Sequence, residues 1–255
     1  MIASFRNTLF TGKVIHRLDE TLSTNMYASL LLQQKNVAEG TIVIAENQTA
    51  GRGYAGEVWQ SEPGKNLLAS IIYKPHFIKA KNQFFLNQAV SLGVYDALKV
   101  FTEKDLKLKW PNDIFYKEKK LCGMLIENNV SGNWLQHSIV GIGVNVNQTE
   151  FSSVNGNPIS LKAITKKEYF IEGVLEKIAE QVEVRYLQLR RNEIQQLQRD
   201  YMAALYRLEE EHLYKTSEGK IKAKIVGLNP EGKLLLETEN GWNAYGFKEV
   251  EFLPD

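Results

Sequence analysis

The chain has only one cysteine, Cys122, so no internal disulfide can form and a reducing compartment such as the cytoplasm is expected. It lacks long hydrophobic runs: Leu67–Tyr73 is too short to cross a bilayer, and Met1–Phe10 has no apolar core of a secretion signal. It also lacks an excess of either charge, with 31 basic and 30 acidic residues and a formal net charge of +1. This balance gives no global field that would favour nucleic acid, so no DNA partner is expected, and the short apolar runs predict no membrane partner.

Several common site motifs are missing as well. The 4 histidines are scattered without metal-ligand spacing, so no zinc site is predicted. There is no glycine-rich phosphate loop ending in Lys-Ser or Lys-Thr. Cys122 alternates with its neighbours inside an expected strand, which favours a small core residue over a nucleophile. No helix-turn-helix pattern precedes Val14, so a DNA-binding domain is not expected.

The hydrophobic pattern predicts strands interleaved with helices up to about residue 205, and short strands joined by turns after it. Strands are expected over 14–18, 41–46 and 67–73, with helices over 24–34, 82–101 and 166–205. After Arg207, short apolar segments over 221–228, 233–237 and 242–247 alternate with turn sequences. We therefore predict two domains, 1–206 and a small all-β domain at 207–255, in a chain of 255 residues.

The most informative stretch for a site is Lys109-Trp110-Pro111-Asn112-Asp113, followed by Lys120 and Gly123, because it brings an acid and a lysine onto neighbouring strands. Leu106–Trp110 alternates apolar and polar residues as a half-buried strand does, and the proline interrupts the ladder. A strand from Leu121 to Glu127 then returns, which places Lys120 near the residues that follow Asp113. A lysine beside a carboxylate at strand ends suits chemistry on an anionic reactant, although a surface hairpin with a salt bridge explains this stretch alone equally well.

Further motifs surround this hairpin in a fixed order. Ser23-Thr24-Asn25 and Gln48-Thr49-Ala50-Gly51-Arg52-Gly53 come before it, followed by Gly56 and Trp59, and Gly141-Ile142-Gly143-Val144-Asn145 comes after it. In this order the chain resembles the biotin–protein ligase family, by motif over residues 14–147. The resemblance implies an α+β fold: a mixed β-sheet with helices packed mainly on one face, plus a small SH3-like C-terminal β-barrel.

The resemblance also implies a function: ATP-dependent attachment of biotin to a lysine of a biotin carboxyl carrier protein, through biotinyl-5′-AMP. ATP, Mg²⁺ and biotin would be the small molecules involved, and the enzyme would act as a monomer or homodimer. A lipoate–protein ligase shares this adenylate chemistry, but lipoate has no ureido ring for Ser23, Thr24, Asn25 and Gln48 to bind. A biotin-binding protein with weakened catalysis is a second alternative.

Site roles follow from the resemblance by position. The catalytic residues would be Lys120, Arg52 and Asp113, with Lys120 contacting biotin and the α-phosphate and Asp113 receiving the acceptor lysine. The residues expected to bind biotin are Ser23, Thr24, Asn25, Gln48, Arg52, Gly53, Tyr54, Lys120, Gly123, Gly141 and Gly143. Those expected to bind ATP or the adenylate are Arg52, Trp59, Asn112, Lys120 and Asn145, with Mg²⁺ arriving on ATP near Asn145.

Simpler structural explanations exist for these residues one by one. Ser23 and Thr24 are good helix N-caps, Gly51-Arg52-Gly53 could be an ordinary turn, and a tryptophan such as Trp59 is commonly core. The loop also departs from the family, because Tyr54-Ala55-Gly56-Glu57 holds no second arginine and adds a negative charge. This departure is what supports the weakened-binder alternative.

Overall fold

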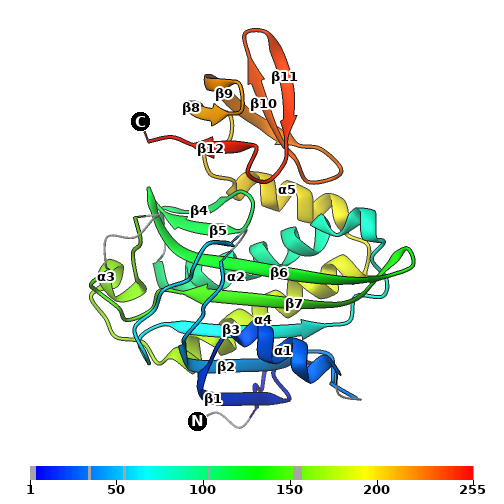
Figure 1. Ribbon diagram of the computed structural model, residues 1–255, viewed down its shortest axis with the longest axis vertical. Helices are drawn as coiled ribbons and strands as arrows, with labels where there is room; N and C mark the ends of the chain where they lie inside the picture. The colour runs from blue at the N-terminus through cyan, green and yellow to red at the C-terminus, as the bar shows by residue number, and fades with distance from the viewer. Residues whose placement is uncertain (1–3, 34–35, 54–55, 103, 152–156, 255) are drawn as a thin grey trace.

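The computed structural model describes residues 4–33, 36–53, 56–102, 104–151 and 157–254. Its larger part is a seven-stranded sheet in the order β1-β2-β3-β7-β6-β5-β4 (Figure 1). Only β1 and β2 pair in parallel, and the remaining neighbours are antiparallel, so the sheet is mixed as predicted. The strands are β1 Ile15–Thr21, β2 Thr41–Gln48, β3 Leu67–Tyr73, β4 Leu106–Lys109, β5 Asp113–Tyr116, β6 Lys119–Ser131 and β7 Trp134–Val144.

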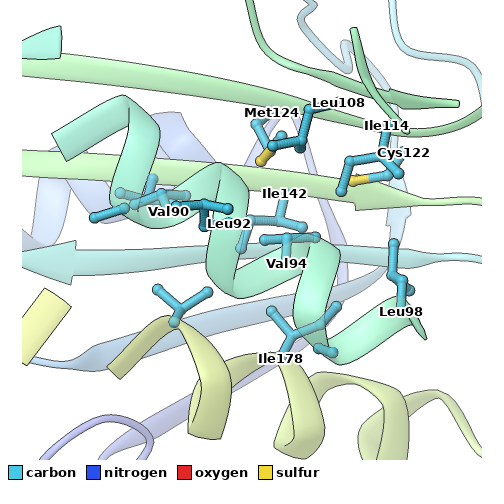
Figure 2. Close-up of a cluster of buried hydrophobic side chains, with 14 of the residues drawn as sticks. Val90, Leu92, Val94, Leu98, Leu108, Ile114, Cys122, Met124, Ile142 and Ile178 are labelled. Atoms are coloured by element: carbon cyan, nitrogen blue, oxygen red, sulfur yellow. The ribbon is translucent and has the colours of Figure 1, made fainter. Parts of the chain in front are cut away.

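Helices cover mainly one face of this sheet. The helices are α1 Thr24–Gln33, the 3₁₀ turn η2 Ala80–Asn82, α2 Phe84–Thr102, α3 Leu161–Thr165, α4 Ile171–Arg190 and α5 Ile194–Ala204. Figure 2 shows α2 lying between the sheet and α4, with Leu92, Val94 and Ile178 in the apolar layer. Helix α1 packs on the opposite face, where Ala28 and Leu31 form a smaller apolar cluster.

Alternation along the strands decides which residues face each layer. Cys122, Met124 and Ile142 point into the α2 layer, so Cys122 is the small core residue that the sequence predicted. Their neighbours Gly123 and Gly143 must therefore face the side that carries α1. The two glycines are direct cross-strand partners in the β6–β7 ladder.

The C-terminal part is a separate five-stranded antiparallel sheet, in the order β11-β10-β9-β8-β12. Its strands are β8 Glu211–Thr216, β9 Gly219–Leu228, β10 Leu234–Thr238, β11 Gly241–Tyr245 and β12 Val250–Phe252. The sequence predicted β9, β10 and β11 but missed β8 and β12. Apolar residues of this sheet, such as Tyr214 and Ile225, belong to the same core cluster as the large sheet. The division at residues 206 and 207 stays a prediction.

One helix prediction was wrong, because the structure has two helices where one was predicted. The segment expected as one helix over 166–205 contains α4 and α5, separated by a turn in which Asn192 adopts a φ of 62°. Asparagine tolerates this left-handed conformation better than most residues, so it can end a helix. The helical composition of the whole segment concealed that break.

Candidate active site

A cavity of about 1150 Å³ opens on the α1 side of the large sheet and extends to the C-terminal sheet. Nearly all of the predicted site residues line it: Ser23, Thr24, Asn25, Gln48, Arg52, Gly53, Trp59, Asn112, Asp113, Lys120, Gly123, Gly141 and Gly143. They come from α1, β2, the segment after β2, β5, β6 and β7. Only folding brings these segments together, because more than a hundred positions separate the first of these residues from the last.

Lys120 and Asp113 form an ion pair inside this cavity. Lys120 Nζ lies 2.8 Å from Asp113 Oδ2, and their side chains are 21% and 19% exposed. The β5–β6 ladder brings them together: Asp113 pairs with Gly123, and a bulge after Ile114 shifts the register so that Phe115 pairs with Lys120. The predicted proximity of the lysine and the carboxylate is confirmed.

The polar residues form one hydrogen-bonded chain at the start of α1. Gln48 Oε1 accepts from the Thr24 backbone N–H at 2.7 Å and from the Thr24 hydroxyl at 3.1 Å. The Ser70 hydroxyl lies 2.7 Å from Thr24 Oγ1 and 2.6 Å from Asn25 Oδ1. Ser23, Thr24 and Asn25 are all buried. The chain presents neutral donors and acceptors at one end of the cavity, away from the Lys120–Asp113 pair.

Glycines form the floor between these two ends, and Trp59 covers part of it. A Cβ placed on Gly143 would lie 2.6 Å from the Trp59 ring, and one on Gly123 would lie 2.9 Å from it. On Gly141 the nearest atom would be Asn25 Oδ1 at 2.4 Å. Among the described residues, no partner binds the buried indole Nε1 of Trp59. No side chains project from these glycines, so the Trp59 ring can lie against Gly123 and Gly143. Trp59 therefore forms a wall of the cavity.

Arg52 reaches the cavity from the segment that follows β2. Its backbone pairs with that of Val58 in an isolated antiparallel β-bridge, and its guanidinium Nη2 lies 3.1 Å from Glu127 Oε2. The Gly53 N–H donates to the Glu57 carbonyl at 2.6 Å. Tyr54, predicted to bind biotin, lies outside the described residues.

The two asparagines predicted to bind nucleotide differ in position. Asn112 lines the cavity, and its Nδ2 donates to the Met124 carbonyl at 2.5 Å. Asn145 is buried outside the cavity lining, where its Nδ2 donates to the Lys120 carbonyl at 3.2 Å. Asn145 thus supports the backbone of Lys120, and its predicted contact with magnesium or phosphate stays a prediction.

No site role was predicted from the sequence for Lys109, Ser70 or Glu127. Lys109 lies with Nζ 4.4 Å from the Phe115 ring centroid and 5.0 Å from that of Phe252, so it bridges the two sheets. Burial lowers the pKa of Lys109, and nearby Asp113 partly opposes that effect. Signals for the other two were present: Ser70 is the sole serine or threonine in an apolar strand, and Glu127 shares a strand face with Gly123.

The mixed sheet and the cavity together define the class: a small-molecule-binding α+β protein whose site joins a neutral polar end to an end that holds the Lys120–Asp113 ion pair. In the part of the chain that the structure describes, no cluster of three or more His, Cys, Asp and Glu suits a metal ion. No helix among the described residues has the length and apolarity needed to span a membrane.

Comparison with known proteins narrows this class to a family. The model of the biotin/lipoate A/B protein ligase family matches residues 17–145, about half of the chain. Over 238 residues the chain is 31% identical to the bifunctional ligase/repressor BirA of Bacillus subtilis, covering 91% of this chain and 72% of that protein. The chain therefore belongs to the biotin/lipoate A/B protein ligase family.

Other relatives resemble the chain over nearly its whole length. The biotin–[acetyl-CoA-carboxylase] ligase of Paracoccus denitrificans is 28% identical over 241 residues, 92% of this chain and 99% of that protein. The structure of the biotin protein ligase of Aquifex aeolicus in complex with biotin and ATP matches with a TM-score of 0.79 and 32% identity, covering 95% of this chain and all of that one. The expected fold class is confirmed.

Proposed function

We propose that this protein is an ATP-dependent biotin–protein ligase, which joins biotin to a lysine of a biotin carboxyl carrier protein through biotinyl-5′-AMP. The observation that carries the proposal is one cavity with the Lys120–Asp113 pair at one end and the neutral polar chain at the other. The Aquifex aeolicus relative, solved with biotin and ATP, supports it. A cytoplasmic location and the oligomeric state stay predictions.

The first step brings two anions together. A carboxylate oxygen of biotin attacks the α-phosphorus of ATP, the bond to the β-phosphate breaks, and pyrophosphate leaves. At ~3 Å and an effective dielectric near 20, each pair of unit charges repels by roughly 5 kcal/mol. Lys120 and Arg52 are two cations of the cavity lining that would offset this repulsion.

The second step needs a neutral amine. The carrier lysine attacks the acyl carbonyl, AMP leaves, and the amine loses a proton. Asp113 is the carboxylate that would receive the amine and accept this proton. In the ligand-free protein Asp113 is paired with Lys120 at 2.8 Å. An adenylate phosphate that engages Lys120 would weaken that pair and leave Asp113 available to the incoming lysine.

The neutral end of the cavity suits the ureido ring of biotin. That ring offers N–H donors and one carbonyl acceptor, and Thr24, Asn25 and Gln48 supply hydroxyl and amide groups to match. The dithiolane ring of lipoate has no hydrogen-bonding groups of this kind. A dithiolane ring placed there would offer Thr24, Asn25 and Gln48 no hydrogen-bond partner, which favours biotin.

Magnesium would come with ATP. The described carboxylates do not form a protein cage for a metal, and Mg²⁺ commonly binds through phosphates, waters and one or two carboxylates. When bound, the ion neutralises phosphate charge in the first step.

The test is transfer to a carrier domain. The protein is incubated with ATP, Mg²⁺ and an apo carrier, together with either biotin or lipoate, and the intact mass of the carrier is measured. We expect one biotinyl group per carrier and release of pyrophosphate. Transfer of lipoate instead would favour the lipoate ligase alternative. Tight biotin binding without pyrophosphate release would favour the weakened biotin-binding protein.

A further inference from the structure

Glu127 lies behind two residues that line the cavity and contacts both. It is on β6, and its Oε2 accepts from Asn25 Nδ2 at 2.7 Å and from Arg52 Nη2 at 3.1 Å. Glu127 itself is not part of the cavity lining. It therefore connects the polar chain of α1 with Arg52 in the segment after β2.

Its contact with Asn25 determines how the amide is oriented. Asn25 Nδ2 also donates to the Leu125 carbonyl at 3.2 Å, so both amide hydrogens are used. The amide oxygen then points at Ser70, which donates to it at 2.6 Å, and toward Gly141. A flipped amide would set its oxygen against the Glu127 carboxylate. The carboxylate therefore keeps Asn25 presenting an acceptor to the floor of the cavity.

Its contact with Arg52 restrains a flexible side chain. Within the part of the chain that the structure describes, Glu127 is the one partner of the Arg52 guanidinium. The contact uses one terminal nitrogen, and the other N–H groups of the guanidinium are left for a ligand. The two side chains are 43% and 38% exposed, and ion pairs of that exposure contribute little to folding stability.

We propose that Glu127 is a positioning residue for biotin binding, acting through Arg52 and Asn25. This inference rests on the proposed function. Glu127 fixes the amide orientation at the neutral end of the site and holds the guanidinium at the cavity before the ligand arrives. Its removal leaves the fold intact and weakens biotin binding, because both partners then have to be ordered by the ligand itself.

Biotin binding without ATP, measured by calorimetry, tests this role. Glu127→Ala should weaken binding roughly ten- to hundredfold, the range of a charge-assisted hydrogen bond. Glu127→Gln retains an acceptor oxygen and should recover part of the loss. In steady-state transfer, Glu127→Ala should raise the KM for biotin by a larger factor than it lowers kcat. The matched control is Glu168→Gln, which removes the charge of an exposed ion pair with Lys162.

A double-mutant comparison separates positioning from an independent effect. The loss caused by Glu127→Ala should be smaller in an Arg52→Ala background than in the wild type. Equal losses in the two backgrounds, or wild-type affinity in Glu127→Ala, would overturn the inference. If the wild-type protein itself fails to bind biotin, the proposed function fails first, and the two failures are thus distinguishable.

Discussion

Lys120 forms an ion pair with Asp113. The effect of removing its charge can be compared with the same substitution at its neighbour Lys119 on the same strand. Lys120→Ala should lower the rate of adenylate formation by about 10²–10³-fold, as losing one stabilising electrostatic contact does. Pyrophosphate release measures this step, and thermal unfolding should show an intact fold. Lys119→Ala is the matched control, because Lys119 is exposed and adjacent. A near wild-type rate in Lys120→Ala would show that the lysine is only structural.

Gly143 tests the contact between the floor and Trp59. A methyl group there would lie 2.6 Å from the indole ring, so the ring has to move or the strand has to strain by about 1–3 kcal/mol. Gly143→Ala should therefore weaken biotin binding measured by calorimetry. Gly227→Ala is the control, since its nearest contact would be Leu235 Cδ1 at 3.9 Å. Equal biotin affinity in wild type and Gly143→Ala would show that the wall formed by Trp59 does not affect the ligand.

At the scale of elements, α2 and α4 approach closely enough that one glycine sets their separation. A Cβ on Gly93 of α2 would lie 2.4 Å from Val182 Cα, which is backbone and cannot rotate away. Leucines and valines of both helices then fill the layer beneath the sheet (Figure 2). The position of the sheet that carries the site depends on this packing.

Two glycine-to-alanine substitutions in these helices should have opposite effects. Gly93→Ala should lower the free energy of unfolding by about 1–3 kcal/mol, because the helices must separate. Gly173→Ala, in the first turn of α4, should raise it by roughly 0.5–1 kcal/mol, since the new methyl meets only ordinary contacts, the nearest at 3.5 Å. Urea unfolding measures both. Stabilisation by Gly93→Ala would contradict the close packing of α2 against α4.

At the scale of the whole molecule, the C-terminal sheet closes one side of the cavity. Trp110 Nε1 donates to the Gly232 carbonyl at 2.9 Å, and its ring stacks on Phe247 with centroids 5.1 Å apart. The Arg207 Nη1 donates to the Leu253 carbonyl at 2.9 Å. The two sheets therefore meet at the segment that carries Lys109 and Asp113, and Figure 1 shows the smaller sheet above β4 and β5.

Lys109, between the two sheets, should make stability depend on pH in a defined direction. Burial lowers its pKa from the ordinary 10.5, so below the lowered value both states are charged and only the folded state bears the desolvation cost. As the pH rises through the lowered value towards 10.5, the folded protein loses the proton and this cost disappears. The wild type should therefore gain stability relative to Lys109→Met over that range.

Thermal unfolding at several pH values measures this difference. The Tm of Lys109→Met minus that of the wild type should fall as the pH rises. Lys107→Met, at an exposed position of the same strand, should show a constant difference. A constant difference for Lys109→Met as well would mean that the folded protein does not disfavour the charged lysine.

The sequence alone determined most of the elements, although not β8 and β12, because alternation and helical spacing reflect which side of each element is buried. Leu67–Tyr73 is the clearest case: its richness in isoleucine and leucine predicted a strand buried on both faces, and β3 has these bounds. It also determined the family, since short motifs retain their order along the chain. The break between α4 and α5 escaped it, because one asparagine in a helical composition is a weak local signal.

Only the tertiary structure decided how the motifs meet. Asn25 and Glu127 are 102 positions apart and 2.7 Å apart in space, a contact that depends on sheet order and on the register of β6 against β7. The bulge after Ile114 likewise sets Lys120 beside Asp113. Register and layer packing arise from interactions summed over the whole core, so no single segment encodes them. For that reason the contacts that Glu127, Ser70 and Lys109 make at the site are evident only in the folded structure.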